Sequence, residues 1–310
     1  MKSEELDYVL PPELIAQRPA VRRDESRLLV FERKSGEVRH RRFSNLPGEV
    51  GDALIVVNDT RVIPARIPLE QPKGEVLLLE RVSVDGVWEA LARPTRRLRA
   101  GRRYGPVELL EHLGEGRWRV RIDGEPAGET PLPPYIDEPL DDPARYQTVY
   151  ARDPGSAAAP TAGLHFTPDL LRQLDVERVT LHVGLDTFRP VTADDLDAHR
   201  LHGERYSVES EAWARIRGAS RVLAVGTTTV RVLETLARGA PLAGRSDLFV
   251  TPGFEFRRID ALLTNFHLPR TTLLGLVMAF AGVEETRELY RIAIGERYRF
   301  YSFGDAMLVL

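Results

Sequence analysis

Five of the seven histidines fall after residue 160, near the expected ends of strands or in loops. An imidazole titrates near neutral pH, so it can take up or release a proton during a reaction. His165 lies in the small-residue string AAPTAGLHF, His182 in LHVGLDTFRP and His267 in TNFHLPR. Residues at element ends are disproportionately functional. These three histidines are therefore acid–base candidates, although each is equally consistent with a core histidine satisfied by the backbone.

A second group of polar residues forms the string H-x-x-H-x-E, made of His199, His202 and Glu204. Histidine and carboxylate ligands suit zinc or iron. The two histidines are three residues apart, whereas the zinc motif H-E-x-x-H needs four. A metal site is therefore the weaker interpretation, and we expect no metal. His202 and Glu204 stay as candidates for proton transfer.

The chain lacks the residues that several other kinds of catalytic or binding site need. The chain has no cysteine, which excludes a thiol nucleophile, a disulfide framework and a cysteine-type zinc site. The G-x-S-x-G motif of serine hydrolases is missing, as is the Gly-Lys-Ser/Thr signature of a P-loop.

The segment VLAVGTTTVRVLE, residues 222–234, predicts an anion or ribose site. An apolar strand ends at Gly226, and Thr227 to Thr229 open a helix. Free N–H groups, hydroxyls and the positive helix end then lie together. Open α/β sheets bind ligands at this carboxyl edge. Arg231 follows one turn later.

These side chains need a scaffold, and the hydrophobic pattern indicates one. RLLVFER (27–33) and DALIVVND (52–59) are predicted strands. After Tyr150 strands and helices alternate, with helices predicted to start at a Thr167 cap and a Ser210 cap. This alternation predicts an α/β fold, a largely parallel sheet with covering helices. Residues 1–67 and 149–310 are expected to form this discontinuous domain.

Residues 68–148 have a different texture, with short strand candidates separated by glycine-rich turns and no helical period. We predict a small inserted all-β domain resembling a barrel. It holds six arginines within eleven positions, Arg93 to Arg103. Arginine suits phosphate contacts, although a solvated charged face explains the run equally well.

Composition narrows the class of protein. The chain has 310 residues, 43% of them hydrophobic, a formal net charge of −3 and only three lysines. No apolar run is long enough to span a bilayer, and the N-terminus lacks the apolar core of a signal peptide. We therefore expect a cytoplasmic protein with no membrane partner.

Taken together, strings along the whole chain resemble the S-adenosylmethionine:tRNA ribosyltransferase-isomerases of queuosine biosynthesis. The strings occur in family order: LPPELIAQRP, SRLLV, VVNDTRVIPAR, PLPPYI, YQTVYA, AAPTAGLHF, HVGLDTFRPV, HRLHGE, GTTTVRVLE, TNFHLPRTTLL and RFYSFGDAMLVL.

The resemblance implies that the ribosyl part of S-adenosylmethionine, a co-substrate, moves onto 7-aminomethyl-7-deazaguanine in the tRNA anticodon loop. The product would be epoxyqueuosine, with adenine and methionine released. It also implies an α/β domain interrupted by a β-barrel. We expect a monomer.

Three features depart from the family pattern. Asp186 stands where glycine is usual, and Leu201 replaces the usual methionine. The segment IPLEQPKGEVLLL is shorter than the glycine- and lysine-rich loop usual after IPAR.

The substrates then suggest which residues act. Proton removal from the adenosyl part and protonation of departing adenine call for His165, His182, His202, His267 or Glu204. Small residues in AAPTAGLHF would let a flat nucleoside approach the backbone. Candidates for binding S-adenosylmethionine are Thr161, Gly163, Gly184, Thr187, Phe188, Gly226, Thr227, Thr228, Arg231, Glu234 and Asn265. Candidates for contacting tRNA are Asn58, Asp59, Arg61, Arg93, Arg96 and Arg97. A non-catalytic RNA-binding protein and a metal-dependent hydrolase are the rival interpretations.

Overall fold

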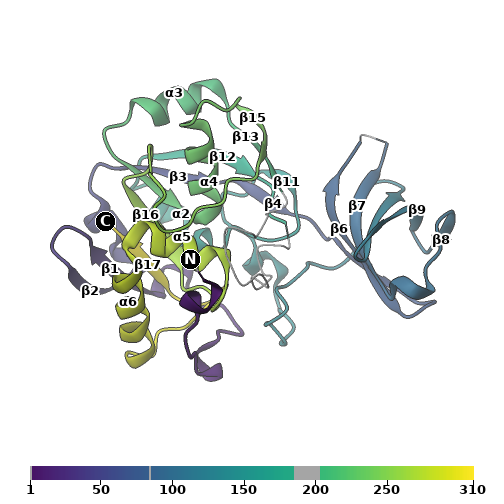
Figure 1. Cartoon of the computed structure of the whole chain (residues 1–310), viewed down its shortest axis with the longest axis horizontal. Coiled ribbons are helices and arrows are strands. Elements are labelled where there is room, and N and C mark those ends of the chain that lie inside the picture. The colour runs from purple at the N-terminus through teal and green to yellow at the C-terminus, as the bar shows by residue number, and fades with distance from the viewer. Residues whose placement is uncertain (1, 84, 185–202) are drawn as a thin grey trace.

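A nine-stranded sheet forms the larger part of the molecule (Figure 1). The computed structural model describes residues 2–83, 85–184 and 203–310. The strand order is β15-β13-β12-β3-β14-β16-β17-β1-β2. These strands are β1 (Arg27–Glu32), β2 (Glu37–Arg42), β3 (Leu54–Asn58), β12 (Val176–Leu181), β13 (Glu204–Ser207), β14 (Val222–Val225), β15 (Ala243–Ser246), β16 (Ala261–Asn265) and β17 (Ala306–Val309).

The prediction of a largely parallel sheet is only partly confirmed, because half of the neighbouring strand pairs are antiparallel. The pairs β12–β3, β3–β14, β14–β16 and β17–β1 are parallel. The pairs β1–β2, β16–β17, β12–β13 and β13–β15 are antiparallel, so the sheet is mixed. The β1–β2 connection is a short turn with Gly36 at a φ of 73°, and so short a connection can join only antiparallel strands.

Helices cover both faces of this sheet. Residues of β3 alternate between two cores: Leu54 and Val56 face one, Ile55 and Val57 the other. A strand buried on both faces reads as a continuous apolar run, which is why 52–59 is recognisable. The helices α3 (Ser210–Gly218), α4 (Thr227–Leu236), α5 (Thr272–Ala281) and α6 (Val283–Gly295) contribute to the first core; α1 (Leu46–Val50) and α2 (Pro168–Leu171) contribute to the second.

One of the two predicted caps is confirmed. The Thr167 hydroxyl accepts a hydrogen bond from the Leu170 N–H at 3.2 Å. The Ser210 cap is wrong, because Glu209 holds the cap position and the Ser210 hydroxyl bonds the Glu211 carboxylate instead. None of the helices described is long and apolar enough to cross a membrane.

A second, antiparallel sheet curls into a half-barrel, at the right of Figure 1. Its order is β5-β6-β7-β10-β9-β8. Its strands are β5 (Arg66–Leu69), β6 (Gly74–Arg81), β7 (Val87–Arg93), β8 (Arg102–Tyr104), β9 (Val107–Gly114) and β10 (Arg117–Ile122). It has its own core, which includes Trp88 and Trp118.

The half-barrel is not the closed barrel expected from the sequence. No ladder joins the edge strands β5 and β8 within the described part of the chain. With four and three residues, these strands are too short to close the sheet. The edge of β5 is covered instead, since Arg66 and Glu129 exchange backbone hydrogen bonds of 3.0 and 2.7 Å.

The two sheets are joined by a short parallel pair, β4 (Thr60–Val62) and β11 (Asp153–Ser156). The chain leaves the main sheet along β4 and returns along β11. Short 3-10 helices occur elsewhere: η1 (Ser3–Leu6), η2 (Pro12–Leu14), η3 (Arg23–Glu25), η4 (Phe43–Asn45), η5 (Thr95–Arg97), η6 (Pro143–Tyr146) and η7 (Thr161–His165).

The small residues of AAPTAGLHF pack inside the protein. Ala158, Ala159 and Ala162 are at most 3% exposed. A Cβ at Gly163 would lie 1.9 Å from the Tyr150 hydroxyl oxygen. The lack of bulk at Gly163 therefore makes room for a buried tyrosine, not for a bound nucleoside as the sequence analysis proposed.

This contact makes a prediction about stability. Gly163→Ala should lower the free energy of unfolding by about 1–3 kcal/mol, because the core has no space for the methyl group. Tyr150→Phe removes the nearest atom and should recover part of the loss in a double-mutant cycle measured by urea unfolding. The control is Gly218→Ala, where no heavy atom lies within 4 Å. Strictly additive effects at the two sites would contradict this explanation.

Candidate active site

The parallel strands β12, β3, β14 and β16 end at one edge of the main sheet. Asn58 ends β3, His182 follows β12, Gly226 follows β14 and Asn265 ends β16. β12 and β14 lie on opposite sides of β3, so the chain changes direction across this strand. Such a switch point at the carboxyl edge is where open α/β sheets bind ligands.

Asn58 and Asp59, predicted to contact substrate, are fully buried. The Asn58 amide donates to the Leu181 carbonyl at 2.9 Å, and its oxygen accepts from the Leu181 N–H at 3.0 Å. The Asp59 carboxylate accepts from the Thr180 hydroxyl at 2.7 Å and lies 3.2 Å from Arg152 Nε. These contacts tie β3 to β12 and to the returning chain, so the two side chains act as structural connectors.

His182 lies at the carboxyl edge of the main sheet and borders open space. Its Nδ1 lies 2.9 Å from the Thr60 hydroxyl. A Cβ at Gly155 would lie 2.9 Å from the imidazole Cε1, so only glycine leaves the ring its place. Desolvation by burial lowers the pKa of His182 below its ordinary value. A neutral imidazole with one nitrogen held by a hydroxyl is suited to accept a proton at the other nitrogen.

His182 lines a cleft between the main sheet and the half-barrel. Two overlapping hollows of about 630 and 440 Å³ share His182, Arg205 and Ser207 from the main sheet with Glu80 and Arg81 from β6. This volume falls in the usual range for ligand sites.

One ion pair joins the walls of the cleft. Arg245 Nη1 of β15 lies 2.7 and 2.6 Å from the carboxylate oxygens of Glu80 on β6. The cleft is therefore built by both sheets and fixed between them.

The start of α4 lies at this edge, directly after β14. Thr227 and Thr228 are 5% and 7% exposed, and the Asn58 amide lies 3.4 Å from the Thr228 hydroxyl. Arg231 forms a buried ion pair with Glu204, whose other oxygen accepts from the Gly184 N–H at 3.0 Å. The structure thus brings together the predicted residues around Gly226 and those flanking 185–202.

His165 is enclosed. It is 5% exposed and stacks on Phe43 with ring centroids 4.9 Å apart. The Ser26 hydroxyl donates to the Arg23 carbonyl at 3.2 Å and lies 2.7 Å from His165 Nδ1. The Ser26 hydroxyl therefore accepts from the His165 Nδ1–H. The His165 Nε2, which lies 3.3 Å from Asn265 Nδ2, is then left as an acceptor. Burial lowers the pKa of His165 to about 3, so the ring is neutral.

The hollow beside His165 is too small for a nucleoside. It measures about 20 Å³, room for roughly one water molecule. Thr161, at the start of η7, is partly exposed. The geometry around His165 favours a structural role.

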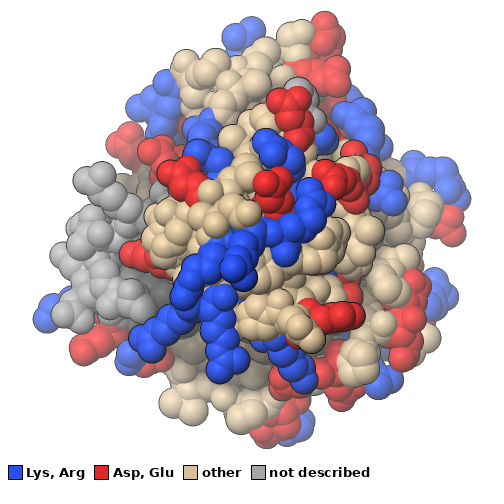
Figure 2. Space-filling model, turned by 90° about the vertical axis from the view of Figure 1, so that its right-hand side faces the viewer, with Lys and Arg blue, Asp and Glu red and all other residues tan. Residues whose placement is uncertain are grey.

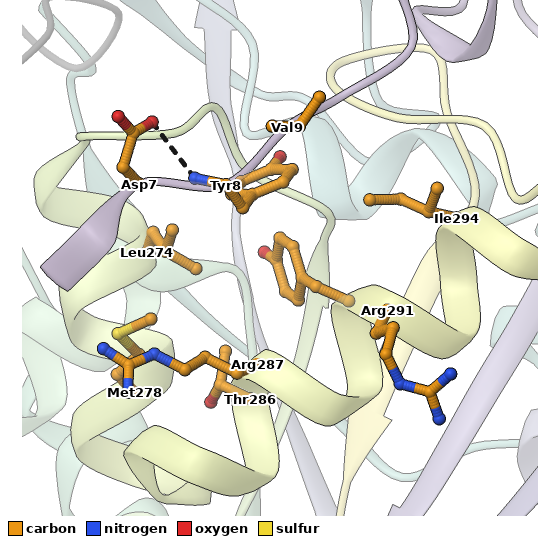
Figure 3. A pocket seen from close by; sticks show the side chains of 10 residues that line it. Asp7, Tyr8, Val9, Leu274, Met278, Thr286, Arg287, Arg291 and Ile294 are labelled. Carbon is orange, nitrogen blue, oxygen red and sulfur yellow. Dashed lines mark hydrogen bonds between the residues drawn. The ribbon is translucent and has the colours of Figure 1, made fainter. Parts of the chain in front are cut away.

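His267 lies away from the cleft. Its ring Nε2 is 2.8 Å from the Thr264 hydroxyl, and its backbone N–H donates to the Tyr290 hydroxyl at 2.9 Å. Burial lowers its pKa to about 3. Beside it lies an apolar groove of about 310 Å³, whose lining includes Tyr8 and Tyr290 (Figure 3).

The groove in Figure 3 has little to offer for proton transfer. Its floor is formed by apolar side chains of α5 and α6, including Leu274, Met278 and Ile294, and no histidine lines it. The cleft at His182 is therefore the better candidate.

The remaining predicted residues fall into three groups. Glu234 is fully buried, and its carboxylate accepts from the N–H groups of Arg257, Arg258 and Ile259, so it anchors a loop. Arg61, Arg93, Arg96 and Arg97 are exposed. Thr187, Phe188 and His202 lie outside the described residues. Among the residues that are described, no group of His, Asp or Glu could hold a metal ion.

Comparison with known proteins agrees with this architecture. A family model described as "Queuosine biosynthesis protein" matches residues 3–309. The chain belongs to this queuosine biosynthesis protein family. It is 54% identical to the S-adenosylmethionine:tRNA ribosyltransferase-isomerase of Rubrobacter xylanophilus, covering 100% of this chain and 98% of that protein. It is 49% identical to the enzyme of the same name from Carboxydothermus hydrogenoformans, covering 100% of both.

A solved structure is also similar. The S-adenosylmethionine tRNA ribosyltransferase of Thermotoga maritima superposes with a TM-score of 0.58 and 38% identity, over 99% of this chain and 100% of that one. The resemblance noted from the sequence is thus confirmed over the full length.

In this queuosine biosynthesis protein, sequence reasoning missed several cleft residues. The cleft residues Gly155, Glu80, Arg205 and Arg245, and the buried Thr60 that holds His182, belong to no chemical motif. Thr60 stands inside the family string VVNDTRVIPAR, which is the only signal that pointed to it.

The two enclosed histidines predict how stability depends on pH. Their folded pKa of about 3 lies below the unfolded value of about 6.5, so acid favours unfolding. The free energy of unfolding should fall as pH drops below about 6.5, by up to about 1.4 kcal/mol per pH unit for each histidine. His165→Asn should reduce this slope in urea unfolding between pH 7 and 5. An unchanged slope would contradict the assignment.

Proposed function

We propose that this chain is an S-adenosylmethionine-dependent tRNA ribosyltransferase-isomerase that modifies 7-aminomethyl-7-deazaguanine in the anticodon loop. It would release adenine and methionine and leave epoxyqueuosine in the tRNA. Membership of the family and the name shared by the relatives support the reaction class. The observation that carries the assignment to this chain's own residues is the cleft at His182, between the two sheets.

In this proposal His182 is the general base. Its lowered pKa keeps the imidazole neutral at pH 7, and Thr60 fixes the ring through Nδ1. Nε2 is then the nitrogen that takes the proton from the adenosyl part of S-adenosylmethionine. His165 and His267 are poor alternatives, because both rings are bonded within the protein and neither lines the cleft.

We place the methionine end of S-adenosylmethionine at the start of α4. The N–H groups of Thr227 and Thr228, in the first turn of α4, have no partner within the helix and suit its carboxylate. The Glu204 carboxylate is engaged by Arg231 and by the Gly184 N–H, so we assign it a structural role at this edge. Asn265 is buried beside His165, where the hollow is too small for a nucleoside, so we assign it no contact with S-adenosylmethionine.

In this proposal the half-barrel binds the tRNA. We propose that residues 68–148 form a domain inserted between 1–67 and 149–310, supported by the separate core of the half-barrel, although that core itself runs from Ile63 to Ile122. The target base would enter the cleft while Arg61, Arg93, Arg96 and Arg97 contact the RNA. We further propose that the protein works as a monomer in the cytoplasm, where its tRNA substrate is found.

The test of the reaction uses the purified chain, S-adenosylmethionine and tRNA that carries the 7-aminomethyl base. Adenine release and epoxyqueuosine, followed by chromatography and mass spectrometry, are the expected products. Binding of both substrates without adenine release would instead favour the non-catalytic RNA-binding protein. Activity that disappears on chelation and returns with zinc or iron would favour the metal-dependent enzyme.

The test of the site is His182→Ala. Turnover should fall about 10²- to 10⁴-fold, the usual contribution of a general base, with little change in thermal stability. The parent enzyme's kcat/KM should decline as pH falls through the lowered pKa of His182, because protonation removes the base. His112→Ala, an exposed histidine on β9, is the matched control and should keep full activity. Full activity of His182→Ala would remove this residue from the mechanism.

A further inference from the structure

The arginines of the half-barrel fall into two sets that the sequence does not distinguish. In the first set each guanidinium lies within 4.0 Å of a carboxylate, so its charge is largely balanced locally. These pairs are Arg66 with Glu75, Arg81 with Glu125, Arg103 with Asp123, Arg117 with Glu89, Arg119 with Glu111, and Arg121 with Glu108.

The second set has no carboxylate partner in the part of the chain that the structure describes. All its members are exposed, and they fall between the end of β7 and the start of β8, around η5. Arg99 donates to the carbonyls of Arg96 and Leu98 at 3.0 and 2.9 Å, which holds its guanidinium without balancing its charge. The set, here the η5 cluster, is Arg93, Arg96, Arg97, Arg99 and Arg102.

The η5 cluster belongs to the half-barrel, which forms one end of the molecule. Figure 2 looks at this end and shows a continuous band of Lys and Arg side chains across it. The chain as a whole carries a formal net charge of −3, so local positive charge here is not a general property of the surface. Unbalanced, exposed arginines are suited to bind phosphates.

The position of the η5 cluster relative to the cleft limits the partner. Trp88, near the start of β7, lines the cleft, and Arg93 ends the same strand. Five residues of extended chain separate them by roughly 17 Å. A partner that contacts both must be a polyanion that continues well beyond the base bound in the cleft.

We propose that the η5 cluster binds the phosphates of the anticodon stem while the anticodon loop enters the cleft. The inference rests on the proposed function, because it takes tRNA as the substrate. It goes further by separating recognition of the stem, through Arg93 to Arg102, from chemistry on the loop. The paired arginines Arg103 and Arg121 have no part in it.

The experiment compares two double variants of the full chain that remove the same charge. Arg96→Ala with Arg97→Ala should weaken tRNA binding about ten-fold or more at low salt. It should also reduce the slope of log Kd against log salt by about 1.4–1.8, because each lost phosphate contact contributes about 0.7–0.9. Arg103→Ala with Arg121→Ala should change neither quantity. Thermal unfolding checks that both variants are folded.

A shorter RNA gives a second readout. An oligonucleotide of the anticodon loop without its stem should bind the parent and Arg96→Ala/Arg97→Ala equally, because it cannot reach the η5 cluster. Adenine release should keep the parent rate in Arg103→Ala/Arg121→Ala, whose arginines are paired with carboxylates. Equal losses in the two double variants, or an unchanged salt slope, would overturn the proposal. Failure of the reaction itself would appear separately, as no adenine release from the parent enzyme.

Discussion

The buried pair Asn58 and Asp59, at the end of β3, is the constraint on which the rest of the structure depends. Here the chain leaves the main sheet for the half-barrel, and here it returns, since the Asp59 carbonyl accepts from the Arg152 N–H at 2.7 Å. Asn58 meanwhile bonds both backbone groups of Leu181 on β12. A buried amide and carboxylate are costly unless bonded, so these contacts define one geometry for the crossing.

That crossing places the cleft. Thr60, two residues after Asn58, holds His182, and the returning strand brings Gly155 against the imidazole. The half-barrel then overhangs the carboxyl edge of the sheet, and Arg245 with Glu80 fixes the far side. Chemically identical side chains thereby acquire different roles: His182 faces space, whereas His165 and His267 are held neutral inside the protein.

Much of the fold could be predicted, because local signals such as the apolar run of β3 and the Thr167 cap decide local structure. Strand direction at the sheet edges and closure of the half-barrel could not, because they depend on pairing between distant segments. The site was harder still. His165 is enclosed by Ser26, 139 residues away in the chain, and no pattern near His165 reveals that contact. The paired arginines of the half-barrel cannot be recognised from the sequence either, because their carboxylate partners lie elsewhere in the chain.

The central claim is that the reaction takes place in the cleft between the two sheets. A crystal structure of the enzyme with an S-adenosylmethionine analogue and an anticodon stem-loop would test it most directly. We predict the target base and the ribosyl group between Glu80 and His182, with the methionine carboxylate at Thr227 and Thr228. Reacting groups found instead beside His165, or in the groove at Tyr8 and Tyr290, would contradict the account.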